Sequence, residues 1–143
     1  MKTLYHSTSL YNCKSIIETG FIESRLGRGI GFEFTGDEED FNNNLKKADG
    51  YVFLSDSFEL VSGLYGSESF FEPVVIELNI DNIILLPDDI DCPECKTWQE
   101  SLEKLNQLKV KAPISINNIV KIHVFKENKV LTVNEFKEYY KEG

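Results

Sequence analysis

The side chains that could do chemistry together lie in three short segments of this 143-residue chain. The first is Tyr5-His6-Ser7-Thr8, which contains one of only two histidines and ends an expected strand. A histidine held there among hydroxyl side chains can donate a hydrogen bond to a ligand hydroxyl. The alternative is a histidine that is satisfied at the edge of the core. His123 lies between two apolar residues of another expected strand, and we assign it no role.

The other two segments lie further along the chain. The second is Gly50-Tyr51-Val52-Phe53-Leu54-Ser55-Asp56-Ser57, a β-rich run and a turn, followed by an expected helix that contains Ser62 and ends near Tyr65. The third is Gln107-Leu108-Lys109-Val110, which begins a strand after an expected helix over 97–106. Each segment alone is a weak signal, and their order and spacing carry the information.

Cys92 and Cys95 have the spacing of half a zinc site, because two thiolates three residues apart can share one tetrahedral metal. Only Cys13 and the two histidines could complete four ligands, so we expect no metal and interpret the pair as part of a plain acidic loop. A redox pair would need a thioredoxin-like βαβ context, which the pattern lacks. An odd number of cysteines fits a reducing cytosolic compartment better than a disulfide scaffold.

The composition is that of one globular domain over residues 1–143, with 41% hydrophobic and 27% charged residues. The net charge of −9 disfavours a non-specific binder of nucleic acid, which needs a cationic surface. Residues 33–59 sum to −6 and residues 68–103 to −9, whereas both ends are mildly basic. No apolar run reaches the length of a membrane span, and the first residues lack the apolar core of a secretion signal. We therefore expect a cytoplasmic protein without membrane contact.

Helical and extended patterns alternate irregularly, without βαβ repeats, which predicts an α+β domain. Ser9 is the expected N-cap of a first helix that Gly20 ends, and Thr132 begins a capping box that opens a C-terminal helix. The expected strands lie at 2–6, 51–54, 73–80, 107–112 and 119–125. These elements must position the three segments.

In this order, the three segments resemble the motifs of the ADP-ribosyltransferase superfamily. The similar branch is the diphtheria-toxin-like and poly(ADP-ribose)-polymerase-like one, which has a His, Tyr, Glu set on three successive core strands. The resemblance covers residues 2–125. It implies an ADP-ribosyltransferase-like fold, in which two small antiparallel sheets pack together with flanking helices, and it implies NAD as the donor substrate.

The resemblance gives the first motif and the loop after the first helix roles in binding NAD. His6 matches the histidine that bonds a ribose hydroxyl, and the backbone of Ser7, where glycine is common, would hold the nicotinamide amide next to Thr8. Arg25 and Arg28 lie in a glycine-rich stretch and could meet the pyrophosphate, because arginine pairs well with phosphate oxygens. The alternative is a flexible loop with solvated arginines.

The second motif would hold the nicotinamide ring. Phe53 falls at the position of the family tyrosine, and Tyr65 resembles the second aromatic residue that stacks on the ring. Stacking needs a flat π face rather than a hydroxyl, so phenylalanine is compatible with this role. Ser62 resembles the small residue that reaches the nicotinamide amide.

The third motif departs from the family pattern. Gln107 occupies the place of the catalytic glutamate, which bonds the ribose 2′-hydroxyl and offsets positive charge as the nicotinamide bond breaks. Glutamine can make the hydrogen bond but carries no charge, and the loss of one such stabilising group costs about 3–4 kcal/mol. Glu103 could substitute for it on the approach to the strand, and Glu100 less well.

The resemblance implies a small metal-free ADP-ribosyltransferase that moves ADP-ribose from NAD to a macromolecular acceptor. The acidic middle of the chain favours a basic protein over a nucleic acid as the acceptor, and we expect a monomer. A first alternative is a catalytically degenerate module that binds or inhibits a basic partner, as a phage- or bacterium-encoded effector would. A second is an NAD-dependent RNA 2′-phosphotransferase, which would need more basic residues than Arg25 and Arg28.

Overall fold

The computed structural model describes residues 3–24, 49–63 and 72–141. The strands are β1 (Thr3–Ser9), β2 (Phe21–Ile22), β3 (Tyr51–Ser55), β4 (Pro73–Asn79), β5 (Leu86–Pro87), β6 (Gln107–Lys111), β7 (Ile114–Ser115), β8 (Ile119–Val124) and β9 (Lys129–Leu131). The helices are α1 (Leu10–Thr19), α3 (Phe58–Gly63), α4 (Trp98–Leu105), the 3₁₀ turn η1 (Ile116–Asn118) and α5 (Val133–Tyr139).

The described strands form two antiparallel sheets. The larger has the order β5-β6-β3-β1-β4-β8-β9, and β2 pairs with β7 in a separate two-stranded sheet. The expectation of an α+β domain is therefore confirmed. Two antiparallel sheets are present, as expected, but the larger one is not small, because β1 has partners on both sides and so joins two groups of strands into one seven-stranded sheet.

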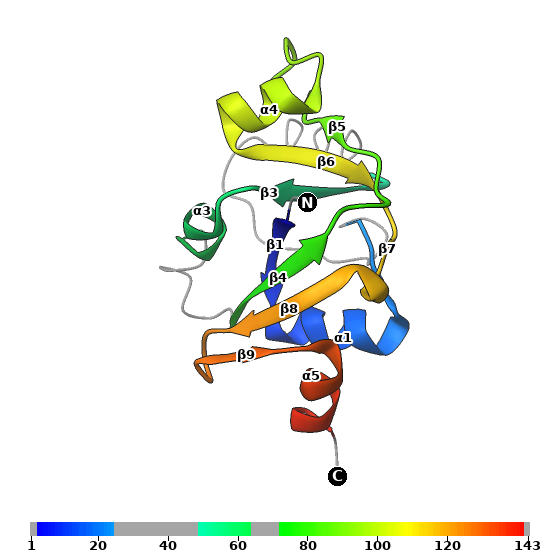
Figure 1. Cartoon of the computed structure of the whole chain (residues 1–143), viewed down its shortest axis with the longest axis vertical. Helices are drawn as coiled ribbons and strands as arrows, with labels where there is room; N and C mark the ends of the chain where they lie inside the picture. Colours follow the sequence, from blue (N-terminus) through cyan, green and yellow to red (C-terminus); the bar gives the residue numbers. More distant parts are fainter. Residues whose placement is uncertain (1–2, 25–48, 64–71, 142–143) are drawn as a thin grey trace, which may run out of the picture.

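That sheet is weakly joined at one place. Strand β1 pairs with β4 along its whole length, but its only register pair with β3 in the described structure is Tyr5–Ser55. Strand β3, in turn, pairs with β6 along its whole length. In Figure 1, β3 and β6 run across the upper part of the molecule, whereas β1 runs downward beneath them. The sheet thus divides between β1 and β3 into a β5-β6-β3 group and a β1-β4-β8-β9 group.

One hydrophobic core holds both groups together. Alternate strand residues face it, as period-two alternation requires: Val52 and Leu54 come from β3, and Leu4 comes from β1. Helix α1 adds Cys13 and Ile16, and further contributions come from β4, β6, β8, α4 and α5. These are Val74, Ile76, Leu78, Leu102, Leu108, Val110, Ile122, Val124 and Phe136.

The first helix begins and ends, and the last helix begins, where the sequence predicts. The Ser9 side chain accepts a hydrogen bond from the backbone N–H of Asn12, and Gly20 ends α1 with a left-handed φ of 91°. Thr132 and Glu135 form the predicted capping box of α5. Within the described ranges, no helix has the length and apolarity that a membrane crossing requires.

Candidate functional site

The three sequence motifs lie on three adjacent strands. Strand β1 carries the first, β3 the second and β6 the third, and the sheet order places β3 between the other two. Ser55 pairs with Tyr5 on one side and with Gln107 on the other. These three residues form one row across the sheet, in which the outer two are separated by two strand spacings, or about 10 Å.

His6 lies beside the single pair that joins β1 to β3. Its ring nitrogen Nδ1 is 3.3 Å from the carbonyl oxygen of Phe53, so this side chain spans the junction between the two groups of strands. The carbonyl oxygen only accepts, so in this contact Nδ1 carries the proton and donates. Strand alternation turns the His6 side chain to the face opposite the row that contains Gln107, which is the core face that Leu4 occupies. His6 therefore meets the second motif at the backbone of Phe53.

Phe53 and its cross-strand neighbour form the second part of the site. Phe53 is half-buried and pairs with Lys109 of β6. The Lys109 ammonium lies 2.8 Å from a carboxylate oxygen of Asp89 and 4.1 Å from the centre of the Tyr51 ring. This contact combines an ion pair with a cation–π interaction, and it fixes a positive charge beside the second motif.

Gln107 is held by a buried carboxylate. Its side-chain nitrogen Nε2 donates a hydrogen bond of 2.7 Å to Oδ2 of Asp88, which is fully buried. The other carboxylate oxygen of Asp88 accepts hydrogen bonds from the backbone N–H groups of Ile90 and Asp91, at 3.1 and 3.2 Å. Burial, and to a lesser degree the charge of Asp88, raise the pKa of the Asp91 carboxyl group.

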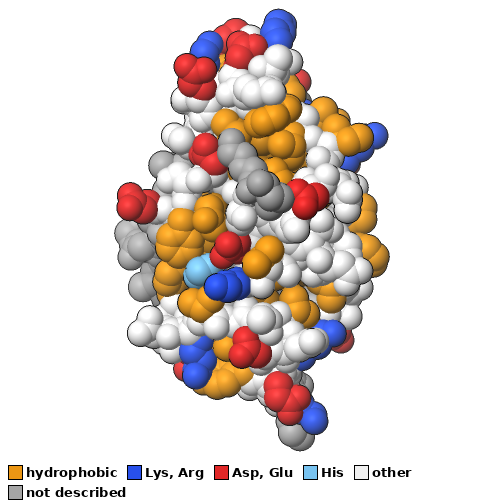
Figure 2. All heavy atoms as spheres, viewed as in Figure 1, with side chains coloured by type: hydrophobic (Ala, Val, Ile, Leu, Met, Phe, Trp, Pro, Cys, Tyr) orange, Lys and Arg blue, Asp and Glu red, His pale blue; other side chains and the backbone are white. Residues whose placement is uncertain are grey.

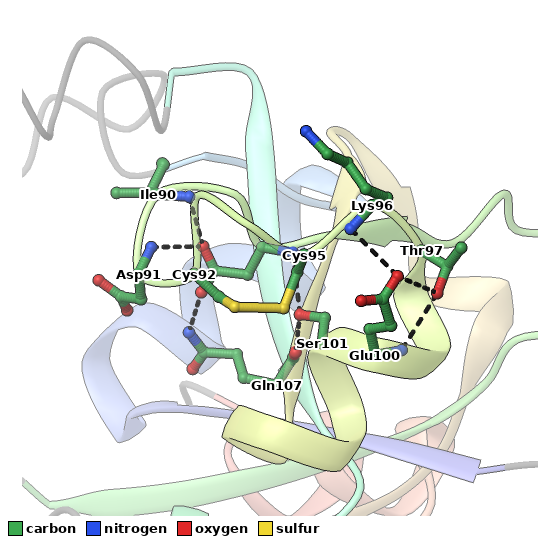
Figure 3. The surroundings of a disulfide bond; sticks show 10 residues. Ile90, Asp91, Cys92, Cys95, Lys96, Thr97, Glu100, Ser101 and Gln107 are labelled. Carbon is green, nitrogen blue, oxygen red and sulfur yellow. Dashed lines mark hydrogen bonds between the residues drawn. A yellow bond between two sulfur atoms is a disulfide. The ribbon is translucent and has the colours of Figure 1, made fainter.

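The main chain of Gln107 is tied to the same turn. The Ser101 hydroxyl accepts a hydrogen bond from the Asp88 backbone N–H and donates one to the Gln107 carbonyl oxygen. Figure 3 shows Gln107 and Ser101 next to the disulfide, with Ile90 and Asp91 in the turn that leads to Cys92. Both the side chain and the backbone of Gln107 are therefore fixed by contacts with Asp88 and helix α4.

Cys92 and Cys95 form a disulfide, which closes the turn between Asp88 and α4. Both are buried, and their Cα atoms lie 5.4 Å apart. The interpretation of this segment as a plain acidic loop is wrong here, because its two cysteines are bonded to each other. The reason is local: a backbone hydrogen bond from the Cys95 N–H to the Cys92 carbonyl makes a turn that brings the two side chains together. Bonded to each other, these sulfurs offer no thiolate to a metal.

The remaining predicted site residues are distributed unevenly. Ser7 is half-buried and Thr8 is buried, both on β1 next to His6. Glu103 is exposed on α4, one residue beyond the buried Leu102, and it is not on the strand that carries Gln107. Ser62 belongs to α3. The residues that lie outside the described ranges are Arg25, Arg28 and Tyr65.

His123 belongs to a cluster on the outer face of the sheet. Its Nε2 is 3.2 Å from a Glu77 carboxylate oxygen, and its ring centre is 4.8 Å from that of Phe58 on α3. Phe58 also contacts Tyr5 and Phe125. Figure 2 shows hydrophobic side chains gathered next to a histidine on the face it displays. These contacts give His123 a structural place, in which it helps to pack α3 against the sheet.

Asp88 is a residue of the candidate site that belongs to none of the three sequence motifs. The available signal was its place directly after Pro87, because an aspartate in a turn commonly bonds backbone N–H groups two or three residues on. Its contact with Gln107 depends on the pairing of β5 with β6, which has no local sequence signature. Across the parts of the chain that the structure describes, no group of three or more His, Cys, Asp or Glu residues could hold a metal ion.

Comparison with known proteins adds no relative. No protein-family model matches the chain, and neither the curated proteins nor the solved structures give a significant match. The arrangement of residues described above is therefore the basis for any statement of function.

Proposed function

We propose that this chain is an ADP-ribosyltransferase-like protein that binds NAD at the junction of β1 and β3 and transfers ADP-ribose to a macromolecular acceptor. The observation that carries the proposal is the sheet order β6-β3-β1, because it puts the three motifs of the resemblance on adjacent strands. The resemblance was drawn from motif order along the chain, and sequence order alone does not make strands neighbours. The adjacency is thus independent support.

In this proposal each motif residue contacts a different part of NAD, the ADP-ribose donor. His6 orients a ribose hydroxyl, Phe53 stacks on the nicotinamide, and the Gln107 carboxamide accepts a hydrogen bond from the 2′-hydroxyl. In the transfer, the bond between C1′ and the nicotinamide nitrogen breaks, and its electron pair leaves with nicotinamide. A nucleophile of the acceptor then forms a bond to C1′ and loses its proton. We propose a basic protein as the acceptor and the cytoplasm as the compartment.

A second candidate function is a degenerate module that binds NAD or a basic partner without turnover. The hydrogen bond from Gln107 to Asp88 favours this candidate, because it shows the glutamine built into a stable network at the place of the expected glutamate. Both candidates share an NAD site and differ in whether nicotinamide is released.

Calorimetric titration with NAD tests the shared part. We expect binding by the native chain and a loss of about tenfold in affinity for His6→Ala, which corresponds to roughly 1.4 kcal/mol for one hydrogen bond to the ligand. His123→Ala is the matched control, because it removes the other histidine, which pairs with Glu77 and lies on β8, separated from β1 by β4. The absence of binding at millimolar NAD would overturn the proposal, as would equal effects of the two substitutions in folded proteins.

Nicotinamide release from NAD then separates the two candidates. Release by the native chain, with ADP-ribose found by mass spectrometry on co-expressed protein, supports the transferase. NAD binding without release supports the binding module.

A further inference from the structure

The fully buried carboxylate of Asp88 contacts the one motif residue that departs from the family pattern. All three of its described hydrogen bonds are bonds that it accepts: two from backbone N–H groups of its own turn and one from Gln107. An ionised carboxylate accepts and does not donate, and this set of donors satisfies it as an anion. Asp88 is therefore a fixed negative charge, one hydrogen bond from Gln107.

This contact decides which end of the Gln107 carboxamide faces Asp88. A carboxamide has an NH₂ group that donates and an oxygen that accepts, and without a partner it can turn about its last bond to exchange them. Asp88 can only meet the NH₂ group, so the oxygen Oε1 must lie on the other side. Figure 3 shows this arrangement, with the Gln107 nitrogen in the hydrogen bond and its oxygen pointing away from it. Gln107 is half-buried, so part of its side chain is accessible.

The same contact changes the strength of that oxygen as an acceptor. A hydrogen bond to an anion is stronger than one between neutral groups, and it polarises the donor amide so that its oxygen becomes more negative. Burial of Asp88 increases this effect, because charges interact more strongly away from water. Gln107 then resembles a glutamate to a ligand, because it presents an acceptor oxygen whose negative charge is increased by the carboxylate of Asp88.

We propose that Asp88 is the positioning residue of the NAD site: it orients the Gln107 carboxamide so that Oε1 accepts the ribose 2′-hydroxyl, and it supplies the charge that the missing glutamate would carry. This inference rests on the proposed function. It identifies Asp88–Gln107 as a pair that does the work of one glutamate, so that glutamine at this position is compatible with NAD recognition.

A charge swap across the pair tests the proposal. In Asp88→Asn, the side-chain oxygen of residue 88 still accepts the hydrogen bonds of the turn, and its new NH₂ group takes the place of the carboxylate oxygen that faced Gln107. Two NH₂ groups cannot bond to each other, so the Gln107 carboxamide must turn. Gln107 then presents its own NH₂ group, not its oxygen, to the ligand. In the double variant Asp88→Asn with Gln107→Glu, the NH₂ group of residue 88 donates to the carboxylate of residue 107. An acceptor oxygen then faces the ligand again.

The readouts are NAD affinity by calorimetry and the amide resonances of Gln107 by NMR. We expect Asp88→Asn to weaken NAD binding about tenfold and to shift the Gln107 NH₂ resonances without ligand, and the double variant to recover native affinity or better. Asp91→Asn is the matched control. It removes an exposed carboxylate from the same turn while its backbone N–H remains, and it should bind NAD as the native chain does.

The outcomes separate the inference from the proposed function. If the native chain binds NAD and a folded Asp88→Asn variant binds it with equal affinity, the role of Asp88 is overturned and the proposed function is not. A double variant that binds no better than Asp88→Asn also overturns it, because a merely structural role for Asp88 predicts no rescue. A native chain that does not bind NAD overturns the proposed function, and the inference with it. Thermal melting of every variant shows that the affinities refer to folded protein.

Discussion

Lys109 shows how a single charge is held inside this sheet. Its side chain is only 10% exposed, whereas that of its partner Asp89 is 55% exposed. The pair is asymmetric. Asp89 can return to water if it loses Lys109, but the Lys109 ammonium, if it loses Asp89, keeps only the Tyr51 ring among its described contacts. Removing one partner of a buried charge costs more than the contact itself contributes.

We therefore expect Asp89→Ala to lower the free energy of unfolding by about 2 kcal/mol and Lys109→Met by less than about 1 kcal/mol, as measured by urea denaturation. Lys126 and Glu72 form the control pair, since their side chains are 55% and 44% exposed. Either substitution there should cost less stability than Asp89→Ala does, because water screens an exposed pair. A larger loss for Lys109→Met than for Asp89→Ala would contradict the argument.

Cys13 links stability to pH at the other end of the core. Burial raises the pKa of its thiol from 9.0 to about 12, so the folded protein holds this proton more tightly than the unfolded chain does. The contribution of Cys13 to stability is then complete below pH 9 and is lost as the pH rises toward 12. We expect the urea midpoint of the native chain to fall over this range, and to fall less steeply in Cys13→Ala. Parallel slopes for the two proteins would show that the thiol does not titrate this way.

At the scale of elements, the end of α1 depends on one backbone conformation. Gly20 has a φ of 91°, and a Cβ placed on it would meet nothing within 4 Å. A substitution there costs only backbone strain, which for an L-residue in this region is about 1–2 kcal/mol. Gly20→Ala should therefore lower the free energy of unfolding by about 1 kcal/mol and leave the fold unchanged, as measured by urea denaturation and circular dichroism. A neutral Gly20→Ala would mean that the chain can end α1 in another way.

Elements with a local signal could be predicted from the sequence, and elements without one could not. Helix α1 was predictable because Ser9 and Gly20 are capping residues of known conformation. The expected strand over 2–6 was too short, because the polar residues after His6 have no strand signal and become β1 only through pairing with β4. The short strands β2, β7 and β9 contain too few residues to show a period.

The candidate site follows the same division. His6, Phe53 and Gln107 were named from motif spacing, and the structure places all three on neighbouring strands. The partners of Gln107 were not predictable, because Asp88 reaches it only once β5 has paired with β6 and the Cys92–Cys95 turn has closed. Motif spacing identifies the residue, but the side chains that contact it, such as Asp88, are brought to it by pairing between strands far apart in the sequence.

At the scale of the whole molecule, the negative charge is not separate from the candidate site. The segment 68–103, which carries −9, contains none of the three motifs. Two of its carboxylates nevertheless touch the third motif: Asp88 binds Gln107 and Asp89 binds Lys109. Part of the negative charge thus belongs to the candidate site. It offsets the positive charge of Lys109, and under the proposed function it would stabilise the positive charge that develops on the ribose.

The division of the sheet between β1 and β3 leads to the last prediction. Only Tyr5–Ser55 joins the two strands in the described structure, so a ligand at this junction would add contacts where the backbone ladder has the fewest. Hydrogen–deuterium exchange with mass spectrometry should show that NAD slows exchange in peptides from β1 and β3. Peptides from β8 and β9 are the internal control, because they lie on the far side of β4.

An equal slowing in all four strands would mean that NAD only raises global stability, without a site at the junction. A slowing confined to β8 and β9 would move the site to the outer edge of the sheet. Since β3 and β1 share one core across the junction, including Leu54 and Leu4, local protection there also requires that opening at the junction occurs without global unfolding. The experiment therefore tests both the place of the ligand and the weak joint in the sheet that would receive it.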